Sequence, residues 1–243
     1  MSPEISLIFD LDGTLFDTAP GLVHTMNALL ARRGRGPLGL DDIKTQLSFG
    51  ARAIMKSALE QSGLTASADE LEELFGEFIR HYTAIMADMS HPYPGLVRTL
   101  ERFEDAGCVM GVCTNRFETS AMTLINALGL KIYFKTVIGQ DSIGIAKPDP
   151  APVFETLARM GGEPSRAIFI GDSEVDVAAA RAAGMPVIVV SFGYASIPAL
   201  ELGADLVIDH FDELEEAVNE LARRPRLDLP CSSALYAHSL KGD

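Results

Sequence analysis

Short apolar segments that alternate with longer helix-like segments constrain the fold of this chain more than any other feature. Six segments rich in Val, Ile and Phe are too short for independent helices, and we interpret them as buried strands: residues 5–9, 108–113, 136–139, 167–170, 187–191 and 206–208. Helix-like stretches lie at residues 96–106, 118–128, 150–160, 176–183 and 197–202. Strands separated in this way pair in parallel, with helices on both faces of the sheet. The sequence therefore predicts a doubly wound parallel α/β core.

One long segment interrupts this alternation. Residues 19–89 contain no strand pattern, and apolar side chains recur at helical spacing over residues 69–89. Turn-forming residues at 92–95 return the chain to the core. We therefore predict an α/β core made of residues 1–18 and 90–223, a small all-helical domain inserted after the first strand at residues 19–89, and an irregular C-terminal tail at residues 224–243.

Composition narrows the class of partner and the compartment. The net charge of −14 disfavours binding to nucleic acids and to anionic membrane surfaces, so a small molecule is the expected partner. The three scattered cysteines (Cys108, Cys113 and Cys231) form no disulfide framework, which fits a reducing compartment. The N-terminus lacks the pattern of a secretion signal, and no apolar run reaches the ~18 residues that span a bilayer. We expect a cytoplasmic protein.

Residues capable of chemistry directly follow the predicted strands. In an open parallel sheet the ligand-binding crevice lies beyond the carboxyl ends of the strands, so residues placed there converge. In chain order they are Asp10, Asp12, Gly13, Thr114, Asn115, Lys147, Asp172, Ser173 and Asp176. The sequence therefore predicts one functional edge of the sheet.

The acidic residues at this edge indicate a metal ion. Asp10 and Asp12 are two residues apart, so their side chains point the same way while the chain stays extended, and Gly13 then permits a tight turn. Two carboxylates ~4 Å apart repel by roughly 4 kcal/mol at an effective dielectric constant of about 20, and Asp172 adds to this repulsion. A hard divalent cation with oxygen ligands relieves it, and we expect Mg²⁺.

The same residues suit phosphoryl transfer. An aspartate can attack phosphorus to form an aspartyl-phosphate, while a second acid protonates the leaving alkoxide and later deprotonates water. Asp10 fits the first role and Asp12 the second. Lys147 supplies positive charge, and Thr114 and Asn115 supply neutral donors for the phosphoryl oxygens.

Four motifs together resemble those of the haloacid dehalogenase-like hydrolase superfamily. They are Asp10-Leu-Asp12-Gly13-Thr14, Thr114-Asn115, Lys147-Pro148 and Gly171-Asp172-Ser173-Glu-Val-Asp176, and they occur in the family's order. The helical insertion resembles that superfamily's mobile cap. The resemblance covers about residues 4–222 and implies a Rossmann-like core carrying a small helical cap.

The resemblance also implies individual roles. Asp10 would be the nucleophile and a metal ligand, Asp12 the acid/base and a metal ligand through its carbonyl, and Asp172 the remaining protein ligand. Thr114 and Asn115 would bind the phosphoryl group, Lys147 would stabilise its charge, and Asp176 would hold Lys147 or a metal-bound water. The acid at Asp12 points to phosphate chemistry, because the true dehalogenases lack an acid there.

Further segments resemble the phosphoglycolate phosphatase branch: residues 9–20 with the following Leu22, Phe192-Gly193-Tyr194, and residues 203–209. This implies 2-phosphoglycolate as the substrate. Arg52, in the cap, is a candidate ligand for the substrate carboxylate, although an exposed helix arginine is the simpler interpretation.

Alternative functions stay open. Relatives with similar signatures act on pyrophosphate, nucleotides or sugar phosphates, and a phosphomutase would use the same motifs. A receiver-like, phosphate-storing module fits less well, because it needs neither Asp12 nor a cap. The sequence leaves the oligomeric state open, with a homodimer as the candidate.

Overall fold

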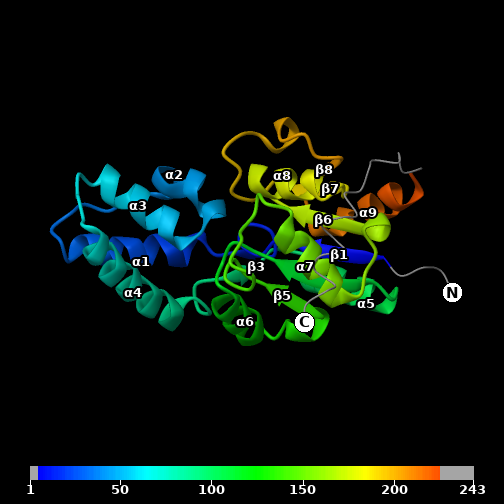
Figure 1. The fold of residues 1–243 in the computed structure, drawn as a ribbon, viewed down its shortest axis with the longest axis horizontal. Coiled ribbons are helices and arrows are strands. Elements are labelled where there is room, and N and C mark those ends of the chain that lie inside the picture. Colours follow the sequence, from blue (N-terminus) through cyan, green and yellow to red (C-terminus); the bar gives the residue numbers. More distant parts are fainter. Residues whose placement is uncertain (1–4, 225–243) are drawn as a thin grey trace.

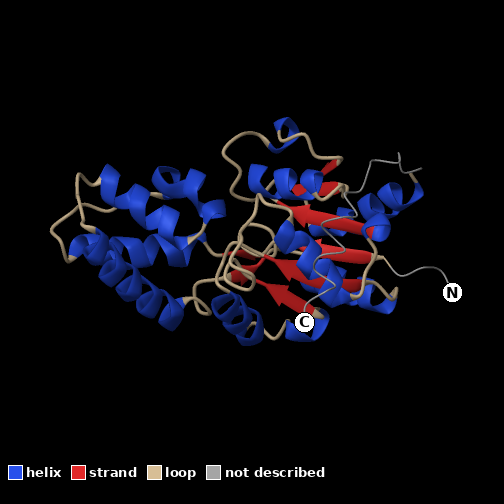
Figure 2. Cartoon of the chain, in the orientation of Figure 1, coloured by secondary structure: helices blue, strands red, loops and turns tan. Residues whose placement is uncertain are grey.

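The computed structural model describes residues 5–224, and its centre is a six-stranded parallel sheet (Figures 1 and 2). The strands, in spatial order, are β5 (Thr136–Ile138), β4 (Val109–Cys113), β1 (Ser6–Phe9), β6 (Ala167–Gly171), β7 (Val187–Val190) and β8 (Leu206–Ile208). The chain runs from β1 outward to β5 and then crosses back to β6, so the strand order reverses beside β1. Ligands bind at such a reversal in open α/β sheets.

Helices cover both faces of this sheet. They are α5 (Leu96–Asp105), α6 (Glu118–Ala127), α7 (Ala151–Met160), α8 (Glu174–Ala182) and α9 (Leu214–Arg223). Leu7 and Phe9 of β1 belong to the core that includes apolar residues of α5, α6 and α9, whereas Ile8 belongs to the core shared with α7 and α8. Alternate residues of one strand thus serve opposite faces, as the strand period of two requires. The predicted doubly wound α/β fold is confirmed.

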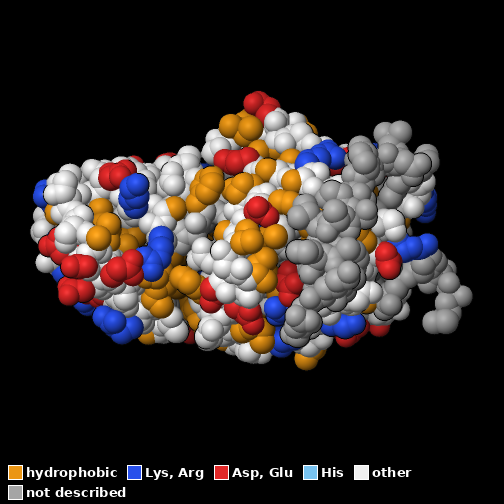
Figure 3. Space-filling model, viewed as in Figure 1, with side chains coloured by type: hydrophobic (Ala, Val, Ile, Leu, Met, Phe, Trp, Pro, Cys, Tyr) orange, Lys and Arg blue, Asp and Glu red, His pale blue; other side chains and the backbone are white. Residues whose placement is uncertain are grey.

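The segment between β2 (Phe16–Asp17) and β3 (His91–Pro92) is helical, and its helices lie at one end of the molecule (Figure 1). It contains α1 (Ala19–Ala31), α2 (Leu40–Ile43), the 3₁₀ helix Lys44–Phe49, α3 (Ala51–Gln61) and α4 (Ala68–Ile85), which we call the helical lobe. Ser67 caps α4: its hydroxyl accepts a hydrogen bond from the Glu70 amide at 3.3 Å. Charged side chains of both signs are scattered over the visible face of the lobe (Figure 3).

Several elements differ from the sequence prediction. The helix expected at residues 197–202 is only a three-residue 3₁₀ helix, Ala199–Glu201, because Pro198 and Gly203 confine it. Helix α9 was not predicted, although its buried Leu214, Ala217, Val218 and Leu221 follow helical spacing. The predicted tail, residues 224–243, lies outside the described residues except for Arg224.

A small antiparallel pair flanks the helical lobe and also was not predicted. Strand β2 (Phe16–Asp17) pairs with β3 (His91–Pro92), where the chain leaves and rejoins the core. Two residues are too few to show a period, so only the tertiary contact defines these strands. Over residues 5–224, the longest helices are too polar or too short to serve as membrane spans.

Candidate active site

Asp10 lies at the carboxyl end of β1, where the backbone still pairs with β6: the Asp10 amide donates to the Ile170 carbonyl at 2.9 Å. The chain then turns at Gly13, whose φ is +83°. A Cβ at Gly13 would lie 2.5 Å from Oδ2 of Asp172, so only glycine allows this approach. The turn therefore brings the end of β1 against the residue that follows β6.

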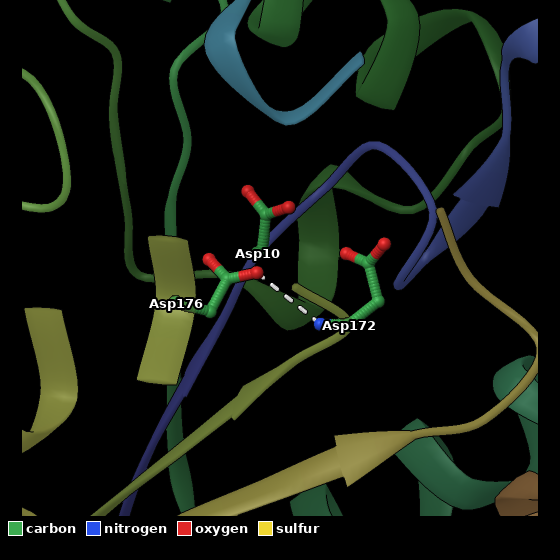
Figure 4. A group of neighbouring side chains, drawn as sticks. All are labelled: Asp10, Asp172 and Asp176. Atoms are coloured by element: carbon green, nitrogen blue, oxygen red, sulfur yellow. Dashed lines mark hydrogen bonds between the residues drawn. The ribbon is translucent and has the colours of Figure 1, made fainter. Parts of the chain in front are cut away.

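Asp172 is buried and held by hydrogen bonds to both carboxylate oxygens. The Thr14 hydroxyl donates to Oδ1 at 2.9 Å, and the Tyr194 amide donates to Oδ2 at 2.6 Å. Asp176, at the start of α8, accepts from the Asp172 amide at 3.2 Å and from the Ser173 hydroxyl at 2.7 Å (Figure 4). Ser173 thus acts as the N-cap of α8 and fixes the orientation of Asp176.

Lys147 connects Asp10, which follows β1, with Asp176, which lies in the helix after β6. Its Nζ donates to Oδ1 of Asp10 at 2.8 Å and to Oδ1 of Asp176 at 2.6 Å, and its side chain is only 2% exposed. Burial lowers the pKa of Lys147, but Asp10 and Asp176 outweigh this effect and raise it above its ordinary value. The ammonium is therefore a permanent positive charge at this edge.

Asn115 positions Lys147. Its Oδ1 accepts from the Lys147 amide at 2.9 Å, and its Nδ2 donates to the Lys147 carbonyl at 2.9 Å and to the Ser48 carbonyl of the helical lobe at 3.1 Å. Thr114 is buried next to it, with its hydroxyl accepting from the Arg116 amide at 3.1 Å. Binding of a phosphoryl group by Thr114 and Asn115 stays a prediction.

Three carboxylates form a group that could hold a metal ion. Within residues 5–224, ligand oxygens of Asp10, Asp172 and Asp176 lie within 4.8 Å of one another, and all three side chains are buried (Figure 4). Burial raises the pKa of Asp10 to about 7, despite the lowering effect of Lys147, and burial also raises that of Asp172 well above its usual range. Lys147 alone leaves this group short of positive charge, so a divalent cation fits the residues present.

Asp12, also predicted as a site residue, points to a different set of partners. Its Oδ2 accepts from Nε of Arg116 at 3.0 Å, and its Oδ1 accepts from the Thr18 hydroxyl at 2.6 Å. The Asp12 side chain is not in the three-carboxylate group. The predicted metal contact of Asp12 is through its main-chain carbonyl, and it stays a prediction.

Arg116 is the site residue that sequence reasoning missed. It directly follows the Thr114-Asn115 motif, and that position after a strand was the available signal. The Arg116 side chain is 8% exposed and lies between Asp12 and the helical lobe, where its Nη2 donates to the Tyr82 hydroxyl at 2.9 Å.

Arg52 has other partners than those expected of a substrate ligand. Its guanidinium pairs with Glu72, with Nη2 3.0 Å from Oε2, and stacks 4.0 Å from the centre of the Phe75 ring. About half of its side chain is exposed. In this arrangement the simpler interpretation, an exposed helix arginine, describes Arg52 better.

A small cavity separates the helical lobe from the sheet edge. Its volume is about 30 Å³. The residues around it are Asp12, Leu22, Leu47, Gly50, Ala51, Ile54, Ile79, Tyr82, Asn115, Arg116, Phe117, Ser120 and Gln140. The space suits a water molecule but is too small for a phosphate ester.

Known proteins resemble this chain over most of its length. Residues 7–190 match the family model of the haloacid dehalogenase-like hydrolases. The chain is 42% identical to the phosphoglycolate phosphatase of Caulobacter vibrioides, over 87% of this chain and 90% of the relative. It is 40% identical to the phosphoglycolate phosphatase of Agrobacterium fabrum, over 88% and 91% of the two chains.

Solved structures with the same fold also resemble this chain. The crystal structure of a predicted phosphoglycolate phosphatase from Haemophilus somnus 129pt superposes with a TM-score of 0.83 at 27% identity, covering 89% of this chain and 99% of that one. The crystal structure of a putative phosphoglycolate phosphatase from Lactobacillus delbrueckii has a TM-score of 0.80 at 25% identity, covering 88% and 97%.

Proposed function

The chain belongs to the haloacid dehalogenase-like hydrolases and is a phosphatase, and we propose that it hydrolyses 2-phosphoglycolate with Mg²⁺ through an aspartyl-phosphate on Asp10. The observation that carries the class of reaction is the buried Asp10, Lys147 and Asp176 arrangement at the strand reversal. The substrate rests on relatives named phosphoglycolate phosphatase at about 40% identity over nearly the whole chain.

In the first half of the proposed reaction, Asp10 attacks the phosphorus atom. A bond forms between an Asp10 carboxylate oxygen and phosphorus as the bond to the glycolate oxygen breaks, and Asp12 gives its proton to that oxygen. Lys147, held 2.8 Å from Asp10, balances negative charge on the transferred group. Glycolate then leaves.

In the second half, Asp12 takes a proton from a water molecule that attacks the phosphorus of the aspartyl-phosphate. The bond between Asp10 and phosphorus breaks, and inorganic phosphate is released. Asp12 has thus regained the proton that it gave to glycolate, so one acid serves both steps.

For the metal, we propose Asp10 and Asp172 as carboxylate ligands and Asp12 as a ligand through its main-chain carbonyl. Asp176 orients Lys147 and completes the acidic group. When bound, Mg²⁺ supplies positive charge that offsets the phosphoryl oxygens and the clustered carboxylates.

The helical lobe, in this proposal, is a cap domain that closes over the substrate. The hydrogen bond from Asn115 to the Ser48 carbonyl and the contact of Arg116 with Tyr82 join the lobe to the sheet edge. Closure excludes bulk water, which strengthens the electrostatic interactions around the phosphoryl group.

The test is release of inorganic phosphate by the purified chain with Mg²⁺. A panel would compare 2-phosphoglycolate with glucose 6-phosphate, glucose 1-phosphate, AMP and pyrophosphate, each with and without EDTA. We expect the highest kcat/KM for 2-phosphoglycolate and no turnover in EDTA. Equal, weak activity over the panel would overturn the substrate, and conversion of one glucose phosphate into the other would indicate a mutase.

A further inference from the structure

We propose that Arg116 selects the substrate by binding the carboxylate of 2-phosphoglycolate in the closed enzyme. This inference rests on the proposed function, because it concerns the part of that substrate that is not the phosphate. It assigns to Arg116 the carboxylate-binding role that the sequence suggested for Arg52, because the Arg52 guanidinium pairs with Glu72.

Arg116 already binds a carboxylate in the structure. Its Nε lies 3.0 Å from Oδ2 of Asp12, and its Nη2 donates to Oδ1 of the same group, so the planar guanidinium meets both oxygens. Bidentate pairing of this kind is the geometry by which arginine recognises carboxylates. The Asp12 side chain thus marks where a carboxylate can be held.

The chemistry of the substrate places its carboxylate near the same spot. A single methylene separates the leaving oxygen of 2-phosphoglycolate from the carboxylate. Asp12 must contact that leaving oxygen to protonate it, so its bidentate pair with Arg116 must open at one oxygen at least. The freed guanidinium edge then lies next to the incoming carboxylate.

The surroundings hold Arg116 in place for this exchange. Nη1 donates to the Ser120 hydroxyl at 3.2 Å and Nη2 donates to the Tyr82 hydroxyl at 2.9 Å, so the guanidinium is fixed from both α6 and the helical lobe. Such support makes a binding group effective, because little side-chain freedom is lost when the ligand arrives.

The charge around the cavity supports the same assignment. Among the described residues that surround it, Arg116 is the cation and Asp12, its partner, is the anion, so the guanidinium becomes available to a second anion when Asp12 turns to the leaving oxygen. Helix α3 begins at Gly50 beside the cavity, with no acidic side chain in its first turn. Its N-terminal dipole therefore adds to the attraction for an anion.

The experiment compares 2-phosphoglycolate with ethyl phosphate, which has a methyl group in place of the carboxylate. The measured quantity is the ratio of kcat/KM for the two esters, in wild type and in Arg116→Gln, Arg116→Lys and Arg98→Gln. Arg98 pairs with Asp212 on the exposed surface and serves as the matched control. Thermal unfolding of each variant accompanies the kinetics.

We expect Arg116→Gln to lower the ratio by about a hundredfold, chiefly through KM for 2-phosphoglycolate, and Arg98→Gln to leave it unchanged. Arg116→Lys should recover part of the ratio, because it keeps the charge and loses the planar fork. A loss of contact with Asp12 slows both esters, so it cancels in the ratio. If Arg116→Gln does not fold, Arg116→Lys tests the role of Arg116. We then expect its ratio of kcat/KM for the two esters to be lower than that of the wild type.

The outcomes distinguish failure of the proposed substrate from failure of the proposed role of Arg116. A wild-type enzyme with no preference for 2-phosphoglycolate over ethyl phosphate contradicts the proposed substrate itself. A wild-type preference that survives in folded Arg116→Gln and Arg116→Lys overturns the role of Arg116 and leaves the substrate standing. Arg52→Gln is measured in the same way, and loss of the preference in that variant but not in Arg116→Gln also overturns the role of Arg116.

Discussion

At the scale of single residues, the proposed mechanism depends most directly on Asp10. We expect Asp10→Asn to lower phosphatase turnover at least about a thousandfold, because the amide is a far weaker nucleophile than the carboxylate. Asp105→Asn, an exposed change at the end of α5, should keep wild-type turnover. Steady-state release of phosphate measures both variants, and substantial turnover by folded Asp10→Asn would refute the nucleophile assignment.

In the proposed metal site, the raised pKa of Asp10 should make Mg²⁺ binding depend on pH. Because the pKa in the metal-free protein is about 7, compared with an ordinary value of 3.8, the folded chain retains a proton that the unfolded chain releases. The stability from this proton is present below about pH 4 and is lost as the pH rises through about 7, where the buried carboxylate becomes charged. Mg²⁺ competes with that proton, so its affinity should fall about tenfold per pH unit below 7.

The measurement is the rise in Tm caused by Mg²⁺ at about pH 8 and at about pH 5.5. We expect a larger rise at the higher pH, and a weaker dependence on pH in Asp10→Asn, which removes one competing proton. An equal rise at both values in the wild-type protein would be incompatible with Asp10 as a ligand that titrates near 7.

The sequence was sufficient to predict site residues that are charged and that follow a predicted strand. Asp10, Asp172 and Lys147 follow predicted strands, and parallel topology brings such positions together. Arg116 also follows a strand, but the reason to assign it to the site is its contacts with Asp12 and Tyr82, which the sequence does not show. Only the packed structure shows which of two arginines, Arg52 or Arg116, is buried at the site.

At the scale of elements, helix α1 begins with an unusual cap. The Thr18 hydroxyl binds Asp12, so it leaves the helix amides uncapped, and the Tyr194 hydroxyl accepts from the Thr18 and Ala19 amides at 2.7 and 2.9 Å. The same hydroxyl donates to Asp17 at 2.7 Å, so Asp17 helps to hold Tyr194 in this position. A residue after β7 therefore holds the start of the helical lobe.

We expect Tyr194→Phe to lower the free energy of unfolding by about 1–3 kcal/mol, because it leaves these buried amides without an acceptor. Urea denaturation followed by circular dichroism measures the change. Tyr133→Phe, at a half-buried position, should change the value by no more than about 0.5 kcal/mol. Equal effects of the two substitutions would show that the Tyr194 hydroxyl does not cap α1.

Elements with a strong period were predictable, and those defined by tertiary contact were not. The strands of the sheet came within two residues of their observed bounds because each is a short apolar run between turn formers. By contrast, β2 and β3 have two residues each and exist only because residues 16–17 meet residues 91–92. The Tyr194 cap likewise joins positions 176 residues apart, which no local pattern reveals.

At the scale of the whole molecule, the helical lobe and the sheet edge meet in a closed arrangement. The cavity between them, about 30 Å³, is smaller than a phosphate ester, so in the proposed mechanism the lobe moves away for the substrate to enter and closes again around it. Gly50 is at the point of contact: it has a φ of +86°, and a Cβ there would lie 2.9 Å from the Asn115 carbonyl oxygen. The absence of a side chain at this position allows this close contact between the lobe and the sheet edge.

Gly50→Ala should therefore disfavour the closed form. We expect kcat/KM for 2-phosphoglycolate to fall about tenfold or more, because relief of the new contact costs on the order of 1–3 kcal/mol and that cost falls on closure. Gly63→Ala is the matched control: it also puts alanine at a positive φ in the helical lobe, but nothing lies within 4 Å of the added Cβ. Both variants lose stability from backbone strain, and only the first should lose catalytic efficiency beyond about twofold. Similar kinetics in the two variants would show that close approach of Gly50 to Asn115 is not required for turnover.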